Sequence, residues 1–281
     1  MEHTLKKPAR SPSVIGRLNK AFKDLGRSRR KFLQGSGPEA LHDFRVSLRR
    51  IRTLLGLMKS CIPAGTIKDP LDGLKEIARQ TNALRDQEVL CATLASLPIL
   101  KGPSLDLERW VNSQEDLRRG LELEIREYLG SPSVARRMEN LPRALGKPKI
   151  PGGEAGMRRE IHRRFKKERR RLGKALKNTA GENPSVRSLH RLRVGAKKVR
   201  YTLEELGFLM PNRRRKIAGL CRKLQDRLGA WRDWDKALSL LKKERTRFPE
   251  AKPWRVELGR RKAEAWKGCR KAAKNLRRAL P

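Results

Sequence analysis

The chain has 281 residues, of which 70 are Lys or Arg and 30 are Asp or Glu, so its formal net charge is +40. A charge this far from zero attracts anions, so it predicts a polyanionic partner, but DNA, RNA, polyphosphate and an anionic membrane surface all satisfy it. Charges interrupt every apolar run, and the first residues lack an apolar stretch of signal-peptide length, which excludes a membrane span and favours a cytoplasmic location.

Apolar residues recur every three or four positions along most of the chain, which is the spacing of amphipathic helices. Alternating segments typical of strands are nearly absent. The sequence therefore predicts an all-α fold with four long helices followed by four more. The predicted helices span residues 14–32, 41–58, 71–97, 105–129, 157–176, 186–210, 217–241 and 254–280.

A segment without periodicity separates the two sets of helices. Residues 141–153 are dense in Pro and Gly, which is typical of a connection between structural units. We therefore divide the chain into a first half, residues 1–145, and a second half, residues 146–281.

Neither the cysteines nor any other residue pattern indicates catalysis or metal binding. Cys61, Cys91, Cys221 and Cys269 are far apart in the sequence, with no Cys-x-x-Cys pair and no His at zinc-site spacing. The chain also lacks a Gly-rich phosphate loop and a nucleophile with a matching base. We therefore expect no catalytic residue, no metal and no cofactor.

An internal repeat carries the strongest functional signal. Residues 41–52 and 189–200 share the pattern L-H-x-[FL]-R-V-x-x-[RK]-[RK]-[IV]-R. A second repeat follows at nearly the same separation, with Arg85-Asp86 in the first half and Arg232-Asp233 in the second. The two halves therefore look like duplicates.

On a helix, the repeated segment separates into an apolar side and a basic side. Phe44, Leu48 and Ile51 fall on the apolar side. At about 1.5 Å per residue, the basic stripe extends roughly 15 Å, long enough to meet several successive anionic groups of a linear polymer. The stripe contains His42, Arg45, Arg49 and Arg52 in the first half, and His190, Arg193, Lys197 and Arg200 in the second.

A basic stripe on a helix is more often a solvated face than a binding site, because Lys and Arg are mostly exposed. Solvated faces drift in position and charge type, however, whereas these residues recur at matching offsets in both halves. Arg can grip two oxygens of one phosphate, Lys supplies a compact charge, and His donates from its ring nitrogens. We therefore interpret the two stripes as a site for a phosphate-rich polymer.

These residues resemble the CHAD family, the conserved histidine α-helical domain, as a single module over residues 14–280. The duplicated His-x-x-Arg helix, the Arg-Asp motif and the Lys-x-x-Arg-Tyr sequence ending at Tyr201 match together. The resemblance implies two antiparallel four-helix bundles related by pseudo-twofold symmetry around a basic central channel that binds inorganic polyphosphate, and some members associate with polyphosphate granules. The binding residues that it implies are His42, Arg45, Arg49, Arg50, Arg52, His190, Arg193, Lys197, Lys198 and Arg200.

The family's Arg-Asp motif corresponds to Arg85, Asp86, Arg232 and Asp233. We interpret the two carboxylates as supports that brace an arginine or a helix end, since an acid that faces a polyanion would repel it. Some family members are fused to a triphosphatase with a Glu-x-Glu-x-Lys metal motif. The similar residues 122–126 lie in a helical pattern and end in Arg, so we expect no metal there.

Other functions also satisfy the charge. Non-specific nucleic-acid binding at low salt is one alternative, although zinc-finger spacing and RNA-binding aromatic strands are absent from the sequence and the tryptophans occur at helix-core spacing. An accessory subunit of a polyphosphate-processing enzyme is a second alternative. A hydrolase or kinase would need metal ions and a positioned base, which basic stripes do not supply.

Overall fold

The computed structural model describes residues 13–35, 37, 39–59, 64–98, 103–146, 152–179, 181, 184–209 and 215–280. These residues form helices and short connections without a strand, which confirms the predicted all-α class. The first half contains α1 (Val14–Leu33), α2 (Glu39–Met58), α3 (Ala64–Gln80), α4 (Asn82–Ala95), α5 (Leu105–Gly130) and α6 (Pro132–Leu145). The second half contains α7 (Gly153–Lys177), α8 (Val186–Leu206), α9 (Arg215–Lys243) and α10 (Lys252–Ala279), with short 3-10 turns at Gly207–Leu209 and Pro249–Ala251. Within the described residues, no helix is both long and apolar enough to span a bilayer.

Serine side chains begin several of these helices. Ser13, Ser104, Ser131 and Ser185 precede α1, α5, α6 and α8, and each hydroxyl accepts a hydrogen bond from a backbone N–H in the first turn, at 3.0 to 3.4 Å. These bonds satisfy donors that the helix itself leaves unpaired.

The helix count of the first half was predicted incorrectly, since its described residues contain six α-helices in place of four. The predicted helix 71–97 is divided at Thr81 into α3 and α4. The segment before residue 146 was assigned to the connection but belongs to α6, which starts at a Ser131–Pro132 cap and buries Val134, Leu141 and Leu145. Three buried apolar residues and a strong start signal outweigh the single Pro inside this helix.

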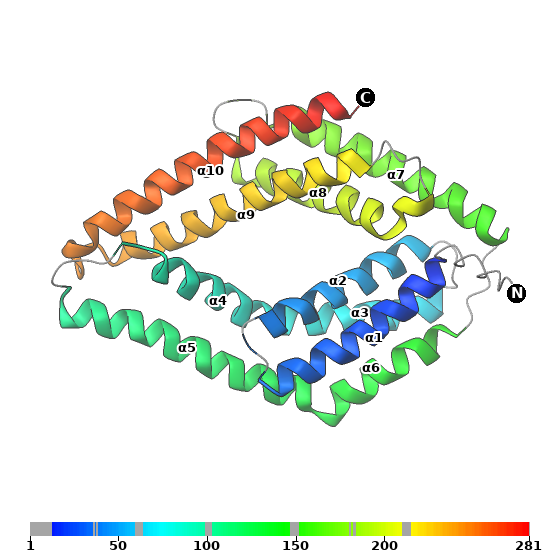
Figure 1. Ribbon diagram of the computed structural model, residues 1–281, viewed down its shortest axis with the longest axis horizontal. Coiled ribbons are helices and arrows are strands. Elements are labelled where there is room, and N and C mark those ends of the chain that lie inside the picture. The colour runs from blue at the N-terminus through cyan, green and yellow to red at the C-terminus, as the bar shows by residue number, and fades with distance from the viewer. Residues whose placement is uncertain are drawn as a thin grey trace, which may run out of the picture.

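Two hydrophobic clusters hold the helices together. The larger cluster takes buried side chains from both halves, including Leu48 and Ile51 of α2 and Val199 of α8. The smaller cluster includes Trp110 and Phe248 and joins α4 and α5 to α9 and α10, at the end of the molecule drawn on the left of Figure 1. The two halves therefore share their apolar core.

Polar contacts reinforce the junction at the smaller cluster. The Trp254 indole N–H donates to the carbonyl oxygen of Pro98 at 2.7 Å. The Arg261 guanidinium donates to the hydroxyl and the carbonyl oxygen of Ser96 at 2.8 and 2.9 Å. Each bond links a residue of the second half to one of the first, and together they fix the ends of α4 and α10 relative to each other.

The helices that carry the repeats face each other across the middle of the molecule. In Figure 1, α2 and α4 of the first half lie opposite α8 and α9 of the second, and α2 contacts α8 while α4 contacts α9. Because the apolar sides of α2 and α8 are buried in the core, their basic sides remain available to build a polar site between the halves.

Candidate anion-binding site

Basic side chains of α2 and α8 come together, and three of them contact one aromatic ring. We call this group the cationic cluster: Arg45, Arg49 and Arg52 of α2, with Arg193, Lys197 and Arg200 of α8. The ring belongs to Tyr201, which is buried. The guanidinium carbons of Arg49 and Arg200 lie 4.6 and 4.7 Å from its centroid, and the Lys197 ammonium lies at 5.8 Å. These cation-π contacts hold charges from both halves beside one another.

Desolvation and neighbouring charges both disfavour the positive charge of Lys197. Its side chain as a whole is exposed, but desolvation of its ammonium group and the charges of four nearby arginines lower its pKa to about 8. Desolvation also lowers the pKa values of Arg45, Arg49 and Arg52. No carboxylate of the described residues forms an ion pair with Arg49, Arg52, Arg193 or Lys197. Among the described residues, the charges of these four cluster members are therefore not balanced by an ion pair.

Two members of the cluster also have structural roles. The Arg45 guanidinium donates to the Thr81 hydroxyl at 2.5 Å and to the Asn82 side-chain oxygen at 2.9 Å, so it stabilises the break between α3 and α4. Arg200 lies 3.5 Å from the Glu204 carboxylate and has a side chain that is only 12% exposed. The other four members donate no hydrogen bond to another described residue.

The structure places Arg50 and Lys198 outside the cationic cluster. Arg50 lies 3.5 Å from the Glu205 carboxylate and 3.9 Å from that of Asp24 on α1. Lys198 is exposed, and its charge acts on Glu168 of α7, where it opposes the rise in the pKa of that carboxyl caused by burial. The carboxylates near both residues set them apart from the unpaired members of the cluster, and both positions lie at the edge of a helical face.

The Asp86 carboxylate connects the two halves beside the cluster. It accepts a hydrogen bond from the Lys236 ammonium at 2.7 Å and lies 3.9 Å from the Arg232 guanidinium. Both basic residues belong to α9, whereas Asp86 belongs to α4. Asp86 thus braces the opposite half of the molecule, and Lys236 is a partner that the repeat did not indicate.

The other residues of the Arg-Asp motifs have different surroundings. The Arg85 guanidinium donates to the Glu88 carboxylate at 3.0 Å within α4. Burial raises the pKa of Asp233, while the charges of Arg232 and Arg193 oppose that rise. Asp233 is therefore electrostatically coupled to the stripe through Arg193.

The sequence matches the CHAD domain family over residues 16–242. This chain belongs to the CHAD family. It is similar in structure to the CHAD domain from the plant Ricinus communis, with a TM-score of 0.70 and 22% identity over 97% of this chain and 91% of that chain. It is also similar to PptA from Streptomyces chartreusis, with a TM-score of 0.63 and 16% identity over 95% of this chain and 97% of that one. At these identities the likeness shows the shared fold alone. A comparison with curated proteins found no match.

The two repeat histidines of this CHAD domain, His42 and His190, lie at the N-terminal ends of the stripes. His42 and His190 each precede the first arginine of their stripe by three residues, so they share its face of the helix. His42 is half-buried and His190 is exposed. Both are positioned next to the cluster, with no hydrogen bond to another described residue.

Tyr201 lies at the centre of the cationic cluster in this CHAD domain, but the pattern of basic residues did not predict its role. It follows Lys197 by four residues, which places both on one face of α8. The four-residue spacing from Lys197 to Tyr201 is therefore the sequence feature that predicts Tyr201 beside the basic stripe. A buried Tyr is more often a packing residue, so the spacing of the basic residues alone does not mark Tyr201.

The Glu-x-Glu sequence at residues 122–124 of this CHAD domain belongs to α5. The Glu122 carboxylate accepts hydrogen bonds from Arg118 at 2.7 Å and Arg126 at 2.5 Å. Within the part of the chain that the structure describes, no three His, Cys, Asp or Glu side chains are grouped as metal ligands. Glu122, the first Glu of the sequence that resembles the metal motif, is therefore bound by two arginines of its own helix.

Proposed function

We propose that this CHAD domain binds inorganic polyphosphate in a basic channel between its two related halves. The observation that carries the proposal is the cationic cluster. Its opposed stripes place Arg49, Lys197 and Arg200 around Tyr201, and among the described residues no carboxylate forms an ion pair with Arg49, Arg52, Arg193 or Lys197. A phosphate chain carries negative oxygens along its whole length, and charge-assisted bonds to them are stronger than neutral ones. Cytoplasmic retention on polyphosphate granules would follow from such binding.

The arrangement of the ring favours polyphosphate over nucleic acid. A base-binding site needs an aromatic face on which a base can stack. Tyr201 is buried and already carries two guanidinium groups and an ammonium group. The tryptophans are also used in packing, since Trp231 contacts Trp266 and Trp110 contacts Phe248, with centroid distances of 6.2 and 5.7 Å.

We infer binding without turnover. Phosphoryl transfer requires metal ions and a group that positions the nucleophile. Two of the carboxylates beside the cluster have other partners, since Asp86 pairs with Lys236 and Glu204 with Arg222 at 2.6 Å. The cluster itself supplies positive charge and hydrogen-bond donors, which are sufficient to hold a polymer.

The proposal predicts discrimination between polyanions at moderate salt. Binding of long polyphosphate and of duplex DNA should both weaken steeply as salt increases, because each releases counterions. At about 150 mM salt, polyphosphate binding should persist and duplex DNA binding should be lost, since duplex phosphates lie on a wide cylinder that does not fit between two helices. Titrations of both ligands across a salt series test this, and equal affinities at that salt would contradict it.

The lowered pKa of Lys197 predicts that polyphosphate affinity decreases at alkaline pH. Its pKa is lowered to about 8 in the free protein, and a bound anion would raise that pKa toward the ordinary value. Binding would therefore take up a proton above pH 8, and the affinity should fall about tenfold for a pH increase of about one unit beyond that value. Titrations between neutral and alkaline pH measure this effect. The side chain of Lys197→Arg does not titrate in this range, so the affinity of this variant should depend little on pH. If its affinity depended on pH as that of the parent does, Lys197 would not be the source of the pH dependence.

A further inference from the structure

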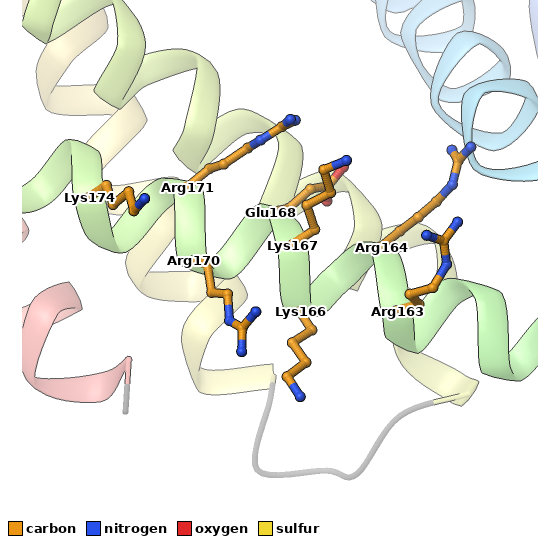
Figure 2. Close-up of a pocket in the computed structure, with 8 residues that line it drawn as sticks. All are labelled: Arg163, Arg164, Lys166, Lys167, Glu168, Arg170, Arg171 and Lys174. Atoms are coloured by element: carbon orange, nitrogen blue, oxygen red, sulfur yellow. The ribbon is translucent and has the colours of Figure 1, made fainter.

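Helix α7 carries a second concentration of basic side chains, separate from the cationic cluster. A surface pocket of about 670 Å³ lies along residues 163–174 and is lined by seven basic side chains and Glu168, as Figure 2 shows. Helical spacing divides the basic side chains into two adjacent rows. One row contains Arg164, Lys167 and Arg171, and the other contains Arg163, Lys166, Arg170 and Lys174.

The positive charge of the first row is only partly compensated. Arg164 pairs with Glu160 at 2.9 Å. Glu168 accepts a hydrogen bond from the Thr202 hydroxyl of α8 at 2.9 Å. Burial raises the pKa of its carboxyl, and the charges of Lys198, Arg164 and Arg171 oppose that rise, so this one carboxylate faces several cations. No carboxylate of the described residues forms an ion pair with Lys167 or Arg171.

Arg164 connects this row to the cationic cluster. Its guanidinium donates a hydrogen bond to the carbonyl oxygen of Gly56 on α2, and Figure 2 shows the side chain directed away from α7 toward the neighbouring helix. Gly56 follows Arg52 by one helical turn on the same face of α2. Arg164 therefore joins this row to the turn of α2 that follows Arg52.

We propose that Arg164, Lys167 and Arg171 form a second binding segment, which we call the α7 row, for the distal part of a long polyphosphate chain. This inference rests on the proposed function. The row extends about 10 Å along the helix, at 1.5 Å per residue. Because the pocket lining contains no aromatic side chain, it lacks the stacking surface that single-stranded nucleic acid requires. A short polymer would occupy the cluster alone, whereas a long one would bind both segments with a higher overall affinity.

The test compares short and long polymers on matched variants. The Lys167→Gln, Arg171→Gln double variant removes two exposed charges from the α7 row, and the Arg270→Gln, Lys274→Gln variant removes the same charges from the exposed side of α10. We expect the first variant to bind triphosphate as the parent does, but to bind long polyphosphate about tenfold more weakly, with a salt slope reduced by about two. The α10 variant should stay within about twofold of the parent for both ligands, since isolated surface charges contribute little.

The possible outcomes separate this inference from the proposed function. If the α7 variant keeps the parent's affinity for long polyphosphate, while substitutions in the cationic cluster reduce it, the α7 row is excluded and the central site stands. If the parent binds neither triphosphate nor long polyphosphate, the proposed function itself fails. If the α7 variant lost binding of single-stranded RNA but kept binding of long polyphosphate, the α7 row would be assigned to nucleic acid and the inference would be overturned. Circular dichroism checks folding, and Lys167→Gln alone serves as a milder second variant.

Discussion

Replacing Arg49 and Lys197 together with alanine is expected to weaken the binding of long polyphosphate about 100-fold at low salt, because two charge-assisted contacts worth about 1.5 kcal/mol each are lost. The two residues occupy equivalent positions in the two repeats, and both contact Tyr201. The slope of affinity against salt should also flatten by about two units, since two fewer phosphate charges are neutralised. Titration of the parent and the variant over a salt series measures both quantities.

The variant should keep its helical fold. The pKa of Lys197 is lower in the folded protein than its ordinary value, so its positive charge opposes folding below pH 8. Removing that charge removes the cost. The Arg270→Ala, Lys274→Ala variant of α10 is the matched control, because it removes the same charges from exposed positions. If the cluster variant bound polyphosphate as the control does, the channel would be misplaced.

Replacing Phe248 with alanine should produce the largest loss of stability. Phe248 is completely buried in the smaller hydrophobic cluster, and its ring centroid lies 5.7 Å from that of Trp110. Truncating a buried Phe to Ala costs about 3–5 kcal/mol, because contacts are lost and a cavity remains. For a chain of this size, that cost lowers the melting temperature by about 10 °C. Thermal unfolding followed by circular dichroism measures the shift.

The more conservative Phe248→Leu variant provides the control for this prediction. It retains most of the buried volume and should cost less than about 1.5 kcal/mol. Polyphosphate affinity, measured well below the melting temperature, should be close to that of the parent in both variants, since Phe248 lies outside the cationic cluster. A melting temperature unchanged by Phe248→Ala would show that the smaller cluster does not contribute to the stability of the fold.

The all-helical class could be predicted because apolar residues recur at helical spacing along most of the chain, and the two basic stripes because one pattern is repeated in both halves. Leu48 and Ile51 alternate with Arg49 and Arg52 at helical spacing, and burying the apolar pair leaves the basic pair on another side. Since the second half repeats this pattern, its basic side is placed in the same way. The family match over residues 16–242 agrees with the motifs that carried the resemblance.

The remaining features depend on contacts between distant parts of the chain. The apolar periodicity continues from Ile77 to Leu84 without interruption, so nothing in the pattern marks the break at Thr81. Arg45 of α2 stabilises that break from outside the segment. Similarly, Asp86 and Lys236 are 150 residues apart, and local spacing cannot pair them.

In α2 and α8, the apolar residues of the core and the residues of the cationic cluster occupy different sides of the same helices. Substitutions on the charged side therefore change electrostatics without opening a cavity in the core. During evolution, such a domain can exchange one anionic ligand for another, or lose binding entirely, and still fold. Descendants that share this architecture are accordingly free to diverge in specificity, and shared architecture alone is a poor guide to what each of them recognises.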